Sequence, residues 1–283
     1  MRIEASLLPD GRRLHLHQGP IDLIIEAFGS GRNIAYERAV LRFDGLLQEL
    51  VDELPALRGA ADQEHVFKGS VARRMQSAVV PYVPEFVTPM AAVAGAVADE
   101  ILDAMSTTPD IDKIYVNNGG DVAFSLAPGQ KMEAVMAATG NDRIVIDSDN
   151  PCRGVATSGW RGRSLSLGIA DSVSVLADTA AEADVAATMI ANAIDLPGHP
   201  AIKRLPACEA DPDSDLGARL VTEDVGPLSS EEIVRALDRG DDYARSLVAR
   251  NMVAGTVLTL QDHIRHIGPH TLLPSKTGEL AHA

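Results

Sequence analysis

A carboxylate and a hydroxyl stand four residues apart within a run of small apolar residues. Asp184 and Thr188 lie in the stretch ADVAATMI, where a helix would place both side chains on one face. Carboxylate and hydroxyl oxygens are hard ligands of the kind that Mg²⁺ and Ca²⁺ accept. Such a pair is more often a solvated helix face, but the apolar neighbours leave little of this helix free to face water. We therefore treat the pair as a candidate divalent-metal site.

A second candidate is the segment Asn118-Gly119-Gly120-Asp121, which separates two apolar runs. Paired glycines supply the positive φ values of a tight hairpin, so a plain turn explains the segment equally well. Glycine also allows bare backbone amides to approach a ligand closely. Asp121 would then either anchor a ligand hydroxyl or order the turn. The sequence leaves these interpretations open.

A third candidate is the loop 154–163, which reads GVATSGWRGR. Thr157, Ser158 and Gly159, together with two nearby guanidinium groups, fit an anion-binding loop. Trp160, the only tryptophan, either stacks on a planar ligand or packs the loop. The serine lacks the G-x-S-x-G spacing and an evident His/Asp pairing, which argues against a serine hydrolase.

The histidines and cysteines do not form a metal-binding pattern. His263, His266 and His270 follow helical spacing, but Gly268-Pro269 interrupts any helix there, so a zinc site is not favoured. The two cysteines lack metal-ligand spacing and are expected to be free thiols.

Strands and helices must position these residues, and periodicity predicts both. Alternating polarity predicts strands over 14–16 and 21–25, on both sides of the 118–121 turn, and over 143–146, 165–167, 173–175 and, at a sheet edge, 257–260. Helical spacing predicts helices over 33–54, 88–105, 179–194 and, as two short pieces broken near Gly240, 231–254. Residues 56–86 are predicted to be irregular, and 207–230 to be a surface excursion.

These elements indicate one α+β domain over residues 1–283, with a mainly antiparallel sheet packed with helices. Its motif core spans about 88–194, and a C-terminal helical part spans about 229–268.

The composition excludes some classes of protein. A net charge of −15 argues against nucleic-acid binding, which needs a dense basic face. The chain has no run of roughly 18 apolar residues and no apolar leader, so we expect a soluble, cytoplasmic protein without a membrane segment. The pattern is compatible with a monomer or a homodimer.

Taken in order, four segments resemble the motifs of the FAD:protein FMN transferases, the ApbE-like family. In that family a small-residue helix ending in Asp precedes a GG-Asp turn, a Thr-Ser-Gly loop and an Asp-x-x-x-Thr helix. The matching segments here are 91–99, 116–122, 155–159 and 172–188. The chain looks closest to a cytoplasmic branch of that superfamily.

The resemblance implies Mg²⁺-dependent cleavage of FAD, with FMN passed to a threonine of an acceptor protein. It implies that Asp184 and Thr188 bind the metal, together with a backbone oxygen near 91–94. The residues that it implies for the flavin-nucleotide pocket are Asn118, Gly119, Gly120, Asp121, Thr157, Ser158 and Gly159.

The chain departs from the family pattern at one motif. Members usually carry Lys-Gly-Tyr where this chain has Ala94-Gly95-Ala96. Residues 1–80 also show little that matches the segment that binds the adenine of FAD. Two further hypotheses therefore stand beside flavin transfer. One is a flavin- or small-molecule-binding accessory protein that does not transfer. The other is an enzyme acting on another phosphorylated or heterocyclic small molecule.

Overall fold

The computed structural model describes residues 3–135, 143–268 and 272–273. Its main sheet is antiparallel throughout, in the order β1-β2-β3-β4-β5-β8-β9-β12-β13. The bounds of these strands are β1 (Glu4–Leu7), β2 (Leu14–Gln18), β3 (Ile21–Phe28), β4 (Lys113–Asn118), β5 (Asp121–Leu126), β8 (Gly154–Ser158), β9 (Ser172–Ala177), β12 (Gly255–Leu260) and β13 (His263–Ile267). Smaller sheets are formed by β10 (Ile202–Pro206) with β11 (Leu220–Val225), and by β6 (Lys131–Val135), β7 (Arg143–Asp147) and β14 (Leu272–Leu273).

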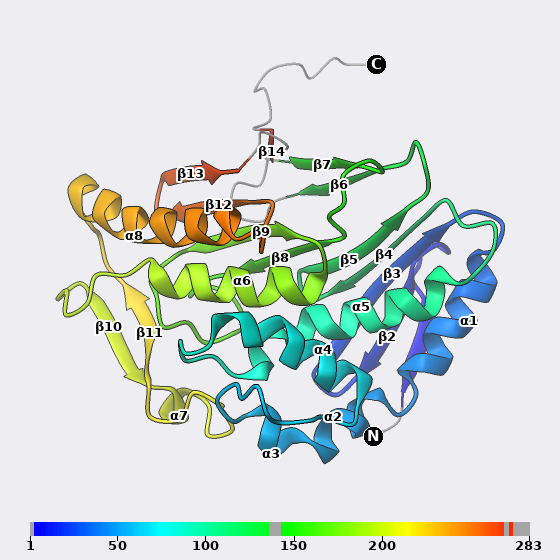
Figure 1. Ribbon diagram of the computed structural model, residues 1–283, viewed down its shortest axis with the longest axis horizontal. Coiled ribbons are helices and arrows are strands. Elements are labelled where there is room, and N and C mark those ends of the chain that lie inside the picture. Colours follow the sequence, from blue (N-terminus) through cyan, green and yellow to red (C-terminus); the bar gives the residue numbers. More distant parts are fainter. Residues whose placement is uncertain (1–2, 136–142, 269–271, 274–283) are drawn as a thin grey trace.

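Helices pack on one face of the main sheet (Figure 1). There α5 (Val93–Ser106) contacts β4 and β5, α6 (Ala180–Ala193) contacts β8 and β9, and α8 (Ser230–Ala249) contacts β12 and β13. The other described helices are α1 (Arg32–Phe43), α2 (Leu46–Asp52), α3 (Leu54–Leu57), α4 (Ser70–Val79), α7 (Ala207–Ala210) and the 3₁₀ turns η1 (Val80–Tyr82) and η2 (Pro89–Ala92). This is the mainly antiparallel α+β architecture that the sequence predicts.

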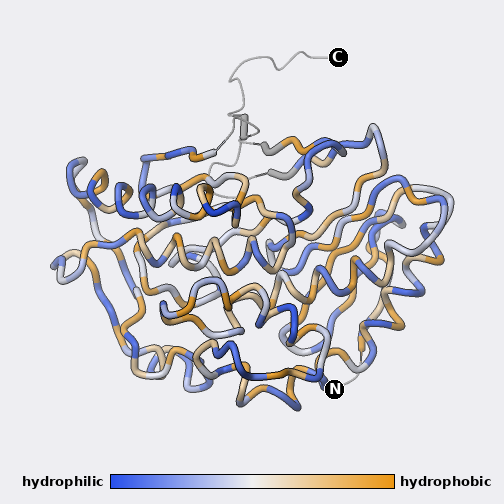
Figure 2. The backbone as a smooth tube through the Cα atoms, viewed as in Figure 1, coloured by the Kyte–Doolittle hydropathy of each residue, from blue (hydrophilic) through white to orange (hydrophobic). Residues whose placement is uncertain are grey.

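The helix α6 is buried on nearly every side, because it lies against the sheet and contacts both α5 and α8. Nine of its fourteen residues are buried, as a helix without a polar face requires. Figure 2 shows the contrast between this helix and the largely hydrophilic α8. A capping box starts α6: Thr179 Oγ1 accepts from the Glu182 amide at 3.2 Å, and the Glu182 carboxylate accepts from the Thr179 amide at 3.1 Å.

Two predictions near the N-terminus are wrong. The helix expected over 33–54 is divided into α1, α2 and α3. Gly45 adopts a φ of +83° that separates α1 from α2. Pro55 lies in the first turn of α3 and does not close the helix. Residues 56–86 contain α4, whose buried Val71, Met75 and Val79 repeat every four residues. That spacing was present in the sequence and indicated a helix.

The C-terminal half brings further corrections. The helix α8 is continuous through Gly240, where a Cβ would overlap the side chain of Ile194; the glycine allows close packing and does not break the helix. The strand expected at 165–167 is a loop. The strand β12 lies between β9 and β13 and is not an edge, and 207–230 includes α7 and β11.

The remaining predicted strands are confirmed, including the hairpin of β2 with β3 and that of β4 with β5. Within the described residues, no helix combines the length and apolar character that crossing a membrane requires.

Candidate functional site

The helices α5 and α6 approach most closely at Gly95. A Cβ at this position would overlap the carbonyl group of Ala180 and the amide of Ala181. Only glycine permits this approach, so the glycine of the Ala94-Gly95-Ala96 sequence has a steric reason to be there. Its neighbours differ from one another, because Ala94 lines a cavity whereas Ala96 is fully buried.

Each of these two helices supplies an aspartate to the first turn of the other. Asp99 of α5 accepts hydrogen bonds from the amides of Ala180 (3.0 Å) and Ala181 (2.9 Å) at the start of α6. Asp184 of α6 accepts one from the amide of Gly95 (3.0 Å) at the start of α5. First-turn amides lack partners within their own helix, and a carboxylate satisfies them. The two helices are therefore antiparallel, and each caps the other. Asp184 thus has a structural role in capping α5 that requires no ligand.

Asp121, the first residue of β5, is in electrostatic contact with Asp184. Loss of solvent raises the pKa of Asp121 to about 7, against a hydrogen bond from the Thr157 amide at 3.3 Å. Burial, and then the charge of Asp121, raise the pKa of Asp184 well above its usual value, against hydrogen bonds from the amides of Gly95 and Ala94. Two carboxylates placed in this way favour either a proton on one of them or a cation between them.

The GG-Asp turn is anchored to α5. Gly119 and Gly120 have φ values of +67° and +120°, which the reversal between β4 and β5 requires. Asn118 is buried, and its Nδ2 donates to the Ala94 carbonyl oxygen at 3.0 Å. This anchoring presents Asp121 towards Asp184.

The Thr-Ser-Gly segment lies at the end of β8. Thr157 Oγ1 is 2.8 Å from Ser174 Oγ on the neighbouring strand, so its side chain is used within the sheet. The hydroxyl of Thr188 donates to Ser158 Oγ at 3.4 Å. Gly159 packs on the backbone just before β9, where a Cβ would not fit. The structure therefore brings Ser158 to Thr188, whereas Thr157 and Gly159 shape the sheet end.

A cavity of about 340 Å³ opens over this region. Of the predicted site residues, its lining includes Asp121, Asp184 and Thr188, but not Asn118, Gly119, Gly120, Thr157, Ser158 or Gly159. The predicted anion-binding loop contributes Arg163 to the lining. Apolar walls come from Phe86, Val87, Met90, Val93, Leu165 and Leu167. A cavity of this size, with apolar walls beside convergent polar and charged groups, has the dimensions of a small-molecule site.

The segment 211–216 forms a further wall that the sequence did not indicate. The Thr88 hydroxyl donates to the Asp215 carboxylate and, although Thr88 precedes η2, makes no capping hydrogen bond to that turn. Arg58 pairs with Asp213 at 3.7 Å, which ties the segment to the N-terminal part of the chain. An acidic, proline-containing segment has the same composition whether it faces solvent or a pocket, so no local signal could place it here.

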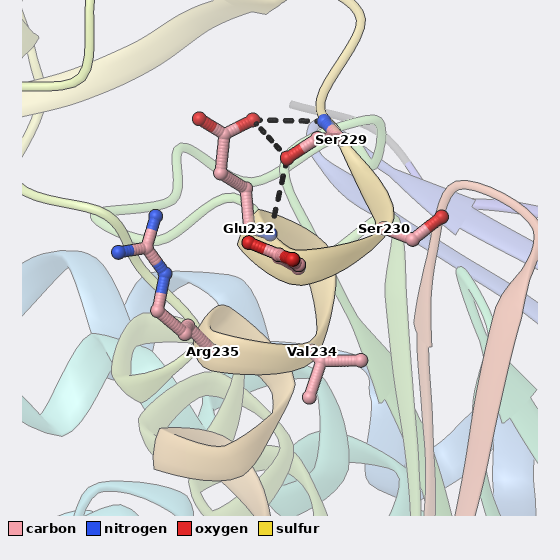
Figure 3. A pocket seen from close by; sticks show the side chains of 6 residues that line it. Ser229, Ser230, Glu232, Val234 and Arg235 are labelled. Atoms are coloured by element: carbon pink, nitrogen blue, oxygen red, sulfur yellow. Dashed lines mark hydrogen bonds between the residues drawn. The ribbon is translucent and has the colours of Figure 1, made fainter.

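A separate hollow at the first turn of α8 has a different character (Figure 3). It measures about 530 Å³ and is lined by Ser229, Ser230, Glu231, Glu232, Val234 and Arg235. The Glu232 carboxylate turns back to accept hydrogen bonds from the amide and the hydroxyl of Ser229, both at 2.8 Å. Its polar groups therefore serve to cap the helix, and we place the candidate site at the α5–α6 cavity.

The donor set at the cavity suits a hard cation. Among the described residues, no three His, Cys, Asp or Glu side chains gather to hold a metal. A cation at Asp121 and Asp184 could add the hydroxyl of Thr188, which also lines the cavity. These are oxygen donors of the kind that Mg²⁺ prefers, and Mg²⁺ usually keeps part of its shell for water and ligand.

Other sequence candidates lie apart from this cation position. Trp160 packs its own loop: its Nε1 donates to Asp171 at 3.1 Å, and Arg161 stacks on its ring at 4.7 Å. His263 and His266 lie on β13, whereas His270 lies outside the described residues. The cysteines are free, as expected, with Cys152 buried and Cys208 exposed.

Comparison with known proteins identifies the family of the chain. A family model described as AbpE bacteria matches residues 5–266. The chain therefore belongs to this ApbE-like family, as the four ordered motifs predict.

Sequence relatives carry the name UPF0280 protein. One from Methanopyrus kandleri is 33% identical over 60% of this chain and 69% of its own length. One from Methanothermobacter thermautotrophicus is 38% identical over 64% of this chain and 58% of its own length. One from Methanothrix thermoacetophila is 36% identical over 38% of this chain and 46% of its own length. The match thus spans less than two thirds of the latter two.

Among solved structures, apo Pseudomonas stutzeri flavinyl transferase ApbE aligns over 95% of this chain and 96% of its own. The TM-score is 0.45 and the identity is 11%, which is too distant for a residue-by-residue correspondence.

Proposed function

We propose that the α5–α6 cavity binds a divalent cation together with a flavin nucleotide, and that the chain transfers FMN from FAD to a protein in a Mg²⁺-dependent reaction. The observation that carries this proposal is the pairing of Asp121 with Asp184 in a cavity that Thr188 also lines. Membership of an ApbE-like family supports it.

In this proposal the chain's own residues hold and orient the ligand. Asp121, Asp184 and Thr188 would hold the cation, and the amide of Gly95 keeps Asp184 in place. Bound Mg²⁺ would neutralise the diphosphate and stabilise the departing AMP as a Lewis acid. The apolar walls around Phe86 would exclude water from a flat ring system. The cavity is small for a whole dinucleotide, so part of FAD would extend beyond it.

A second candidate function is flavin or small-molecule binding without transfer. The observation that favours it is the residue pair at 94 and 96. Ala94 lines the cavity and Ala96 is fully buried, so the lysine and the tyrosine of the family pattern are both missing next to the site. An enzyme acting on another phosphorylated or heterocyclic small molecule fits the same cavity.

Incubation of the purified chain with FAD and Mg²⁺ separates these functions. Release of AMP with transfer of FMN to a threonine-containing acceptor peptide supports the transferase. Tight FAD binding without AMP release supports the accessory protein. Failure to bind FAD at all rejects both flavin hypotheses and leaves the third.

A further inference from the structure

Three arginines lie around the Thr-Ser-Gly segment, and two of them are engaged locally. Arg153 donates to backbone carbonyls of its own loop. Arg161 pairs with Asp171 at 2.6 Å. Arg163 differs from both, because it lines the cavity and, within the part of the chain that the structure describes, has no carboxylate within ion-pairing distance.

Arg163 lies over the turn between β4 and β5. Its Nη1 would be 3.5 Å from a Cβ placed on Gly119, an ordinary contact distance, so the guanidinium lies directly beside this turn. The other arginine of the cavity, Arg58, is paired with Asp213 at 3.7 Å. Arg163 is therefore the cavity arginine that can offer its donors to a ligand.

The other charged side chains of the cavity are mostly acidic, which bears on the role of Arg163. Five aspartates line the cavity: Asp121, Asp184, Asp211, Asp213 and Asp215. An anionic ligand would be repelled by them unless positive charge met it on each side. A cation between Asp121 and Asp184 supplies one positive charge, and Arg163 supplies a second. The parallel N–H donors of a guanidinium match the oxygens of a phosphate group.

We propose that Arg163 positions a phosphate group of the ligand, holding it beside the Gly119-Gly120 turn in the cavity that Asp121 and Asp184 also line. The inference rests on the proposed function for the cation, but it holds for any phosphorylated ligand, with or without a flavin. Arg163 thereby selects phosphorylated ligands over neutral ones of the same shape.

Calorimetric titration with inorganic pyrophosphate in the presence of Mg²⁺ tests this role. Arg163→Ala is expected to raise the Kd roughly tenfold or more, because a charge-assisted hydrogen-bonding pair is lost. Arg163→Lys keeps the charge without the fork and is expected to recover part of the affinity. Arg161→Ala is the matched control. It removes the same charge only two residues from Arg163, but the Arg161 side chain does not line the cavity. It is expected to change the Kd by less than about threefold, since solvent and salt screen that charge.

Equal weakening by Arg163→Ala and Arg161→Ala would mean long-range charge and overturn the proposal. The proposal would also be overturned by an unchanged Kd for pyrophosphate in Arg163→Ala, or by the absence of pyrophosphate binding to the wild type. The melting temperature checks that the variants fold, which is expected because both arginines are exposed. Absence of FAD binding beside Arg163-dependent pyrophosphate binding would reject the flavin proposal alone, whereas FAD binding unchanged in Arg163→Ala would reject only the role of Arg163.

Discussion

The crossing of α5 and α6 contains two carboxylate regions that look alike in sequence and differ in chemistry. At one, both oxygens of Asp99 accept backbone amides of α6, and the group is 6% exposed. At the other, Asp184 accepts amides of α5 but also meets the carboxylate of Asp121 in an open cavity. Asp99 is a capping group whose partners are complete. Asp184 has a like-charged neighbour and access to a ligand, which is the arrangement expected of a binding site.

The largest effect that separates the two regions concerns metal affinity. Asp184→Asn removes a charged oxygen ligand while keeping an acceptor for the Gly95 amide. We expect the affinity for Mg²⁺ to fall roughly a hundredfold or more, with the fold intact, as measured by calorimetry. Asp99→Asn is the matched control and should leave metal affinity nearly unchanged. Comparable losses in both variants would remove the distinction between a capping carboxylate and a ligand.

The next largest effect is expected at the helix crossing itself. Gly95→Ala forces a methyl group against the Ala180 backbone, and α5 and α6 must separate. We expect a loss of about 3 kcal/mol in the free energy of unfolding, measured by urea denaturation. Both caps should weaken together, because both depend on this spacing. A variant with unchanged stability would show that the helices are not held as closely as we describe.

The smallest effect is the pH dependence of stability at Asp99. Burial raises its pKa from 3.8 to about 6, although the hydrogen bonds from the amides of Ala181 and Ala180 favour the charged form, so the native state holds the proton more tightly than the unfolded chain. The stabilising contribution of this protonated carboxyl is complete below about pH 4 and is lost as the pH rises towards 6, by at most about 3 kcal/mol.

The measurement for Asp99 is the difference in unfolding free energy between wild type and Asp99→Asn across this pH range. That difference should change in favour of the variant as the pH rises. A difference that stays constant from pH 4 to 7 would contradict the assigned environment of Asp99.

Three residues that line the cavity, Asp121, Asp184 and Thr188, were candidates from the sequence because their motifs are local. Asp184 and Thr188 share a helix face, and the paired glycines before Asp121 require a turn, so both features depend only on nearby residues. The reciprocal caps between α5 and α6 depend on residues about eighty positions apart, which no periodicity reveals. The same is true of the wall formed by Asp213 and Asp215. Gly240 was misjudged because a glycine that allows packing and one that breaks a helix are identical in sequence.

The most direct test of the account is a fluorescence titration of the purified chain with FAD, in Mg²⁺ and then in EDTA. We predict saturable FAD binding that requires Mg²⁺ and is abolished in Asp184→Asn but kept in Asp99→Asn. FAD binding that is identical in EDTA, or identical in the two variants, would contradict a flavin-nucleotide site built on Asp121 and Asp184.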